Sequence, residues 1–390
     1  MTSKLLSCRE THAKEYGSFP AVVASAPGKL GLLGDFTEFA HGLSVNAAIL
    51  QRVWVAVAPR SDHLVRFFSR EYNERKKASV SNIKFRKEDR WANYPKGVLS
   101  AFVQRGVGLE GLDLTICGDV PQSAGLSSSQ ALCLATAAAL DALFQTQLAP
   151  EELMKIAQGA ETGFLGLPTG LTSLSLQTHI QENQLYFYDA RTQKGEQRAL
   201  ENDWELALVN SRVPSISFDS SARWAREECE SCLRILNSGR GSKFLRDYTK
   251  ADLRERVGTL PESARRRSLH VLDEIARVSE ATELWHSGDW PGIGRLMNRS
   301  HESLRDLFEV SCPEIDWLVK RLQEIDGLLG ARLTGEDSGA CVVALGTPAG
   351  WSRFRPISEE YERIFGFKAE LTVFRPQEGV RVDQKLEPLG

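Results

Sequence analysis

The sequence predicts an α+β protein built from two lobes. Strand-like segments dominate its first part, helical patterns fill residues 220–326, and strands return near its end. Such a segregated order is typical of α+β folds, in which helices and antiparallel strands form separate layers. At 390 residues the chain is also longer than a typical single-core domain. We expect an N-terminal lobe at residues 20–200, a C-terminal lobe at residues 201–390, and a site between them.

Local patterns in the first lobe support this division. Residues 21–26 form a short apolar run, after which Pro27-Gly28 is expected to turn the chain. Residues 53–57 are rich in β-branched side chains, and residues 112–120 alternate between apolar and polar, as a half-buried strand does. Two helices are expected, at residues 127–144 and 150–160. The remaining predicted strands cover residues 185–188, 204–209, 329–334, 340–345 and 371–375.

Composition excludes several classes of protein. The chain is 42% hydrophobic with a formal net charge of -3, whereas nucleic-acid binders usually carry a basic surplus. We find no apolar signal segment in residues 1–16 and no apolar window long enough to span a membrane. Seven scattered cysteines are typical of reduced thiols, and Cys229 and Cys232 lie in a helical pattern without further metal ligands. We expect a cytoplasmic protein; the oligomeric state stays open, with a monomer favoured.

A phosphate-binding loop is the strongest chemical signal. It follows the strand at residues 112–120 and opens the helix at residues 127–144, where unpaired N–H groups and the helix dipole favour an anion. Gly125 allows close approach of a triphosphate, and three consecutive serines add hydroxyl groups. An ordinary helix cap would need one serine. The predicted nucleotide-binding residues of this loop are Pro121, Ser123, Ala124, Gly125, Leu126, Ser127, Ser128 and Ser129.

The loop resembles the second motif of the GHMP small-molecule kinases, and other segments resemble galactokinases in particular. Residues 25–39 are similar to the galactokinase signature, residues 91–98 to its Trp-x-Asn-Tyr segment, and residues 294–314 to its helical region. Residues 330–335 open the third motif. The resemblance runs from about residue 20 to residue 375.

This resemblance implies a GHMP kinase fold, with an N-terminal ribosomal-protein-S5-like lobe and a C-terminal ferredoxin-like lobe. It implies ATP and Mg²⁺ as cofactors and a monosaccharide, galactose or a related sugar, phosphorylated at its anomeric hydroxyl. Lys29 and Ser173 occupy the family's catalytic positions, and Ser129 and Glu161 its Mg²⁺ positions. Trp91 and Asn93 join the nucleotide site. The implied sugar-binding residues are Asp35, Phe36, Glu38 and Gly170.

Several of these positions depart from the galactokinase pattern. Lys29 replaces an arginine and loses its bidentate geometry. Asp35 and Glu38 keep their acidity but change length, and Phe36 replaces a polar histidine. Ser173 stands where the family has its catalytic aspartate. In the third motif, Glu336-Asp337 replaces glycines and would face a triphosphate with like charge.

These departures leave three hypotheses. In the first, the protein is a sugar kinase, since phosphoryl transfer depends mainly on positioning and charge neutralisation, and a general base adds about 10²–10⁴-fold. In the second, it is a catalytically impaired galactokinase paralogue that serves as a ligand-binding sensor or scaffold. In the third, Phe36 forms an apolar wall and the substrate is a non-sugar alcohol.

Overall fold

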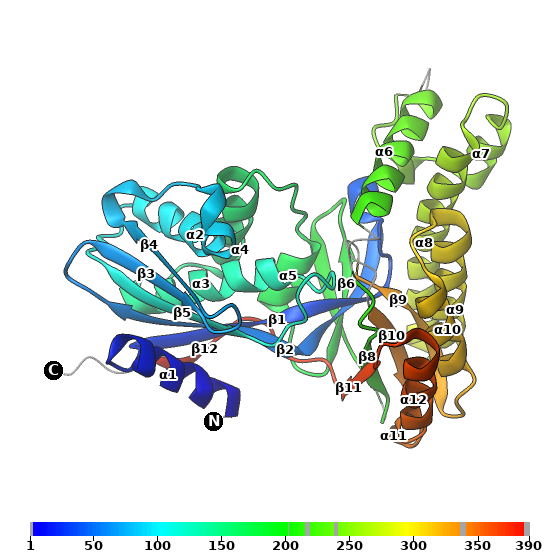
Figure 1. Ribbon diagram of the computed structural model, residues 1–390. Helices are drawn as coiled ribbons and strands as arrows, with labels where there is room; N and C mark the ends of the chain where they lie inside the picture. Colours follow the sequence, from blue (N-terminus) through cyan, green and yellow to red (C-terminus); the bar gives the residue numbers. More distant parts are fainter. Residues whose placement is uncertain (1–2, 202, 215–218, 238–240, 336–340, 386–390) are drawn as a thin grey trace.

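Two β-sheets and their helices form two lobes that lie side by side (Figure 1). A computed structural model of the chain describes residues 3–201, 203–214, 219–237, 241–335 and 341–385. In this part of the chain one sheet has eight strands and the other has four. The predicted α+β class is therefore confirmed. The predicted boundary after residue 200 lies between the last hairpin of the first sheet and the first strand of the second, but residues 381–385, which we assigned to the C-terminal lobe, return to the first sheet.

The first lobe is a twisted, mostly antiparallel sheet with helices on both faces (Figure 1). Its strands are β1 Val22–Leu33, β2 Leu43–Pro59, β3 Leu64–Ser69, β4 Glu74–Ser79, β5 Leu112–Gly118, β6 Gln184–Asp189, β7 Lys194–Ala199 and β12 Arg381–Lys385. One face carries α2 Asn93–Gln104, α3 Ser128–Phe144, α4 Pro150–Gly159 and α5 Thr172–His179; α1 Ser3–Tyr16 lies on the other. Helix α1 and strand β12 were not predicted.

The second lobe places its four-stranded sheet, in the order β11-β8-β10-β9, against a layer of helices (Figure 1). Its strands are β8 Glu205–Asn210, β9 Leu328–Thr334, β10 Cys341–Gly346 and β11 Glu370–Phe374. Its helices are α6 Asp219–Leu236, α7 Lys250–Glu255, α8 Glu262–Ser287, α9 Trp290–Ser303, α10 Pro313–Gln323, α11 Pro348–Trp351 and α12 Phe354–Phe365. The four strands predicted here agree with those observed to within one residue at each end.

Strand β1 corrects the expectation of a turn at Pro27-Gly28. The strand runs straight through these residues and only shifts its register with β2 between Pro27 and Lys29. Pairing on both sides of this irregularity keeps the chain extended, which local turn signals cannot anticipate. Gly28 is needed there because a Cβ atom would lie 2.7 Å from the Ile49 side chain and 3.0 Å from the Leu126 carbonyl oxygen.

The two lobes share packed contacts. Val278, Ala281 and Trp285 of α8 join the buried core of the first sheet, and Trp285 meets Phe187 edge to face. Thr334 at the end of β9 accepts a hydrogen bond from the Gly31 N–H and donates one to the Gly31 carbonyl, at 3.2 and 3.0 Å. Strand β1 therefore belongs to the first sheet yet is fixed by the second lobe.

All seven cysteines are free thiols, and Cys229 and Cys232 are buried on α6. Across the described ranges, no helix has the length and apolar character needed to cross a membrane. In the same ranges, no group of three or more His, Cys, Asp or Glu side chains is arranged to hold a metal ion.

Two buried histidines make the stability of the fold sensitive to acid. Burial lowers the pKa of His12 on α1 to about 4 and that of His270 on α8 to about 3. Their partners are hydroxyl groups, Thr115 at 3.0 Å and Ser303 at 2.8 Å. Because the unfolded chain takes up these protons near pH 6.5 and the folded chain does not, stability is full above that pH and falls below it.

From pH 7.5 to pH 5, His12 and His270 should each lower the free energy of unfolding by about 2 kcal/mol. We expect His12→Gln to lose about 2 kcal/mol less than the parent protein over this interval, measured by urea titration at both pH values. His286→Gln, at an exposed position on α8, is the matched control. Equal pH sensitivity in the His12→Gln variant and the parent protein would contradict the prediction.

Candidate functional site

The predicted phosphate loop lies between β5 and α3, against β1. The Lys29 N–H donates to the Leu126 carbonyl at 3.0 Å, which ties the loop to the strand. Ser123, Gly125 and Ser127 have positive φ angles of 53°, 67° and 58°. Left-handed serines are uncommon and concentrate at functional turns. The loop is thus held in a curled conformation ahead of the helix.

Helix α3 begins with partly exposed serines. Ser128 and Ser129 occupy its first turn, where backbone N–H groups lack intrahelical acceptors. The Ser127 hydroxyl donates to the Ser173 hydroxyl at 2.9 Å rather than capping the helix. The first turn of α3 therefore keeps the N–H groups and positive dipole end that suit a phosphate.

Helix α5 lies against this loop and is capped by one of the residues predicted to bind sugar. Glu38 accepts hydrogen bonds from the N–H groups of Leu171 and Thr172, at 2.6 and 2.9 Å, and so caps the helix whose second residue is Ser173. Gly170 permits this contact, because a Cβ atom there would lie 2.3 Å from the Glu38 carboxylate. The predicted residues Glu38, Gly170 and Ser173 therefore lie together.

A buried glutamine joins α5 to the strand and the loop. The Gln177 side-chain amide donates to the carbonyls of Pro27 and Ser127, at 2.8 and 3.2 Å. Lys29 lies two residues after Pro27 on β1, and its side chain is buried. One glutamine thus fixes the relative positions of β1, the end of the phosphate loop and the helix that carries Ser173.

Asp35 and Phe36 face the second lobe. The Asp35 carboxylate is 2% exposed and forms an ion pair with Arg332 of β9 at 2.7 Å. The Phe36 ring packs on Phe308, with ring centroids 4.6 Å apart, and Phe308 in turn packs on His270. Phe36 thus contributes to the contact between the lobes.

Trp91 lies two residues before α2, and Asn93 is the first residue of that helix. The Trp91 indole donates to Glu74 at 2.7 Å and stacks near Tyr72, whose hydroxyl donates to Gln122 of the phosphate loop at 2.6 Å. Asn93 is buried, and its side chain holds both backbone groups of Arg86. Trp91 therefore reaches the loop through Tyr72, whereas the Asn93 amide is committed to the turn before α2.

Glu161 lies two residues beyond the end of α4 and close to α3. Its carboxylate accepts a hydrogen bond from Thr169 at 2.7 Å. Burial and the Glu161 charge together raise the pKa of Tyr94 on α2 to about 12, and they also raise the pKa of the Cys133 thiol on α3. Since Cys133 lies one helical turn beyond Ser129, Glu161 is close to the face that carries the predicted metal-binding hydroxyl.

The third motif begins against the phosphate loop. Gly335 has a φ of 98°, and a Cβ atom there would lie 2.4 Å from the Ala124 carbonyl oxygen. Glu336 and Asp337, whose charges we expected to face a triphosphate, lie outside the described residues. Their influence on the site stays a prediction.

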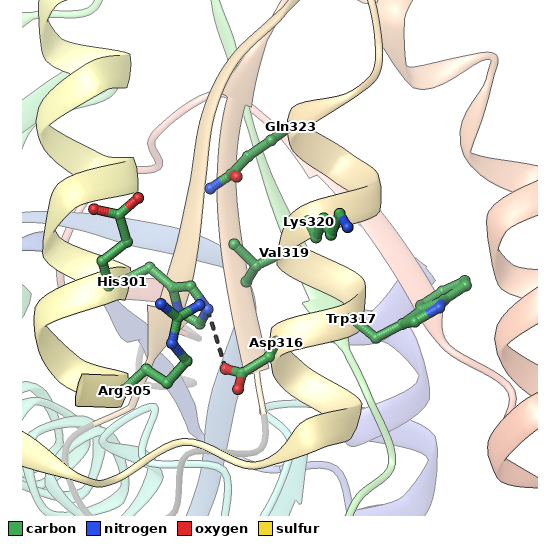
Figure 2. Close-up of a pocket in the computed structure, with 8 residues that line it drawn as sticks. His301, Arg305, Asp316, Trp317, Val319, Lys320 and Gln323 are labelled. Carbon is green, nitrogen blue, oxygen red and sulfur yellow. Dashed lines mark ion pairs between the residues drawn. The ribbon is translucent and has the colours of Figure 1, made fainter.

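A separate hollow lies in the second lobe, between α9 and α10 (Figure 2). It has a volume of about 260 Å³ and mixed charge, with Arg305 and Lys320 beside Glu302 and Asp316. His301 projects between the two helices, and its Nε2 atom lies 3.2 Å from Asp316 Oδ1. None of the residues predicted for catalysis or binding lines this hollow.

Sequence patterns missed the residues that hold the site in place. Gln177 holds the strand beside the loop, and Thr169 holds Glu161. The end of β1 is held by Arg332 and Glu274. An arginine between the apolar neighbours Ala331 and Leu333 of a predicted strand was the one signal available in the sequence.

The cap on α5 gives a stability prediction. Glu38→Ala removes the acceptor of two backbone N–H groups and should lower the free energy of unfolding by about 1–2 kcal/mol. Urea titration measures this change. Glu283→Ala, at an exposed position on α8, is the control. An effect of Glu38→Ala no larger than that of the control would show that the cap does not stabilise the fold.

Comparisons with known proteins agree with this architecture. Residues 93–175 match the GHMP kinases N terminal domain, residues 279–350 match GHMP kinases C terminal, and residues 10–59 match the galactokinase galactose-binding signature. The M. jannaschii mevalonate kinase structure shares the fold, with a TM-score of 0.63 at 16% identity, over 95% of this chain and 100% of that one. The fold is thus the two-lobed fold of the GHMP kinases.

Full-length relatives identify the family to which this chain belongs within the GHMP kinases. A putative galactokinase of Treponema pallidum is 33% identical over 388 residues, covering 98% of each chain. A galactokinase of Roseiflexus sp. is 33% identical and covers 95% of each chain. The crystal structure of Lactococcus lactis galactokinase complexed with galactose superposes with a TM-score of 0.89 at 25% identity, over 98% of this chain and 100% of that one. The chain therefore belongs to the galactokinase family.

Proposed function

We propose that this protein is an ATP-dependent sugar kinase that phosphorylates galactose or a related monosaccharide at its anomeric hydroxyl. The observation that carries the proposal is the hydrogen bond between Ser127 of the phosphate loop and Ser173 of α5, on a helix capped by Glu38. The predicted phosphate-binding residue Ser127 and the predicted sugar-binding residue Glu38 thus both contact the start of α5. Full-length similarity to galactokinases supports the same reaction.

The residues present suit a magnesium nucleotide. Residues 123–129 and the first turn of α3 would cradle the phosphates, and Trp91, with Tyr72 beside it, would border the base. Ser129 and Glu161 offer hard oxygen ligands, and Mg²⁺ commonly needs only one or two protein ligands because substrate phosphates and water complete its shell. When bound, Mg²⁺ supplies neutralisation of phosphate charge.

Positioning and charge neutralisation carry the chemistry we propose. Glu38 and Asp35 would orient the sugar, and Lys29 would neutralise charge that develops on the transferred phosphoryl group. Ser173 can donate or accept a hydrogen bond, but it cannot take the proton of the anomeric hydroxyl as a carboxylate would. We therefore expect slow turnover compared with a kinase that has an aspartate at this position.

The decisive experiment measures ADP release with a panel of monosaccharides that includes D-galactose, with and without Mg²⁺. We expect release that requires both sugar and Mg²⁺, and a sugar 1-phosphate identified by phosphorus NMR. ADP release that never rises above the sugar-free rate would reject the kinase proposal.

The neutral Ser127–Ser173 pair also favours a second function, a galactokinase-like sensor or scaffold without turnover. That function predicts an increase in melting temperature with D-galactose or ATP but no phosphorylated product. Detection of sugar 1-phosphate would exclude it.

A further inference from the structure

A buried ion network from the second lobe surrounds the end of β1. Arg332 of β9 is 0% exposed, and its two terminal nitrogens reach different groups. Nη1 donates to the Leu32 carbonyl at 3.0 Å, and Nη2 donates to Asp35 Oδ2 at 2.7 Å. Arg332 therefore holds both the backbone before the turn and the acidic side chain after it.

Glu274 of α8 holds the middle of the same turn. Its Oε1 atom accepts hydrogen bonds from the Gly34 N–H at 2.9 Å and from Ser300 at 2.6 Å, and Arg277 donates to Oε2 at 2.5 Å. Burial alone would raise the pKa of Glu274, but the charge of Arg332, that of His270 in its protonated form, the charge of Arg277 and the Ser300 hydroxyl together lower it to about 2. The carboxylate therefore stays ionised at neutral pH.

The network is electrically balanced. Asp35 and Glu274 offset Arg332 and Arg277, and the adjacent His270 is neutral because burial lowers its pKa to about 3. Buried ion pairs add little net stability, yet the loss of one partner leaves an uncompensated charge. Such a network is better suited to fixing geometry than to stabilising the fold.

The turn it holds is sterically exacting. Gly34 has a φ of 86°, and a Cβ atom there would lie 2.2 Å from the Leu43 carbonyl oxygen. Thr37, the residue before Glu38, donates a hydrogen bond from its hydroxyl to the Gly34 carbonyl at 2.9 Å. Both acids of the proposed sugar site thus depend on one turn, and residues of the second lobe hold its start.

Strand β9 is itself held from its outer side. His301 Nδ1 accepts a hydrogen bond from the Leu333 N–H at 3.3 Å, and the His301 ring reaches Asp316 of α10 on its other edge (Figure 2). Arg332 therefore projects from a braced strand, as a group that orients another residue must.

We infer that Arg332 and Glu274 are positioning residues, which set the location of the Asp35 carboxylate and thereby the affinity for sugar. This inference rests on the proposed function for its kinetic readout and on geometry alone for its structural readout. Arg332→Met introduces an apolar side chain of similar length and removes the guanidinium group that contacts Leu32, Asp35 and Glu274. We expect the KM for D-galactose to rise about 10- to 100-fold, because small misplacements of binding groups have effects of that size.

Comparing the KM for sugar with the KM for ATP distinguishes a loss of positioning from a general disruption of the fold. The KM for ATP should change less than about threefold, and Arg332→Lys should recover part of the sugar KM. Glu274→Gln keeps the shape of the side chain but loses its charge, and it should also raise the KM for D-galactose. If Arg332→Met does not fold, this variant tests the positioning role. Arg355→Met, at an exposed position on α12, is the matched control. Equal changes in both KM values, or none in the sugar KM, would overturn the inference.

A structural readout tests the same inference without catalysis. In crystal structures of the parent protein and Arg332→Met, or Glu274→Gln if the first does not fold, the Asp35 carboxylate should differ in position by more than about 1 Å. An unmoved carboxylate overturns the positioning role, whether or not any sugar is phosphorylated. Absence of sugar-dependent ADP release in the parent protein, together with a moved carboxylate, would reject only the proposed function.

Discussion

Ser173→Asp raises kcat for sugar phosphorylation by about 10²–10⁴-fold, the usual contribution of a general base. The new carboxylate would stand at the second residue of α5, within reach of the Ser127 hydroxyl that now contacts Ser173 at 2.9 Å. It can accept the proton of the anomeric hydroxyl, which serine cannot do. Steady-state ADP release at saturating D-galactose and ATP measures the gain.

Two further variants make this result specific. Ser173→Asn has nearly the same shape without the negative charge and should leave kcat within about threefold of the parent value, since it supplies no base. Ser279→Asp adds the same charge at an exposed position on α8 and should have no effect. If Ser173→Asp gives no gain, the site has been remodelled beyond the loss of one carboxylate.

Lys29→Ala lowers kcat by about 10²–10³-fold, the typical loss when one charge-stabilising group is removed from a transition state. Lys29 lies on β1, where its own N–H is bonded to the phosphate loop, so the backbone position should survive the change. The KM for sugar should change little, because Lys29 is proposed to act on the phosphoryl group. Steady-state kinetics at varied sugar concentration measures both parameters.

The matched variants test charge against shape. Lys29→Arg keeps the positive charge and should retain most of the activity, whereas Lys155→Ala, at an exposed position on α4, should retain all of it. A Lys29→Ala protein with unchanged kcat would remove Lys29 from the proposed mechanism.

Local patterns in the sequence predicted the elements that depend on local physics. The phosphate loop, the helix after it and the strands of the second lobe follow from apolar periodicity, glycine and serine placement, and strand propensity. Resemblance to a known family added Glu38, Gly170 and Ser173, which the structure brings together.

What the sequence could not show depends on contacts between distant segments. Arg332 meets Asp35 across nearly 300 residues, and Glu274 reaches Gly34 across 240. No periodic pattern encodes such pairs. The extended course of β1 through Pro27-Gly28 has the same origin, because it requires pairing with β2 before and after these residues. Likewise, α1 has too few apolar residues to show a clear helical pattern in the sequence, and it buries only Leu5, Cys8 and His12.

The return of β12 to the first sheet constrains how this chain can fold during synthesis. Residues 381–385 pair with the start of β1, and Arg52 of β2 donates to the carbonyls of Glu378 and Gly379. At 5–20 residues per second, β1 leaves the ribosome roughly 20–70 s before this partner does. Throughout that interval its outer edge has unsatisfied backbone groups, the kind of surface that pairs with other nascent chains. The N-terminal lobe can therefore be completed only after residues 381–385 have been synthesised, long after the other strands of its sheet.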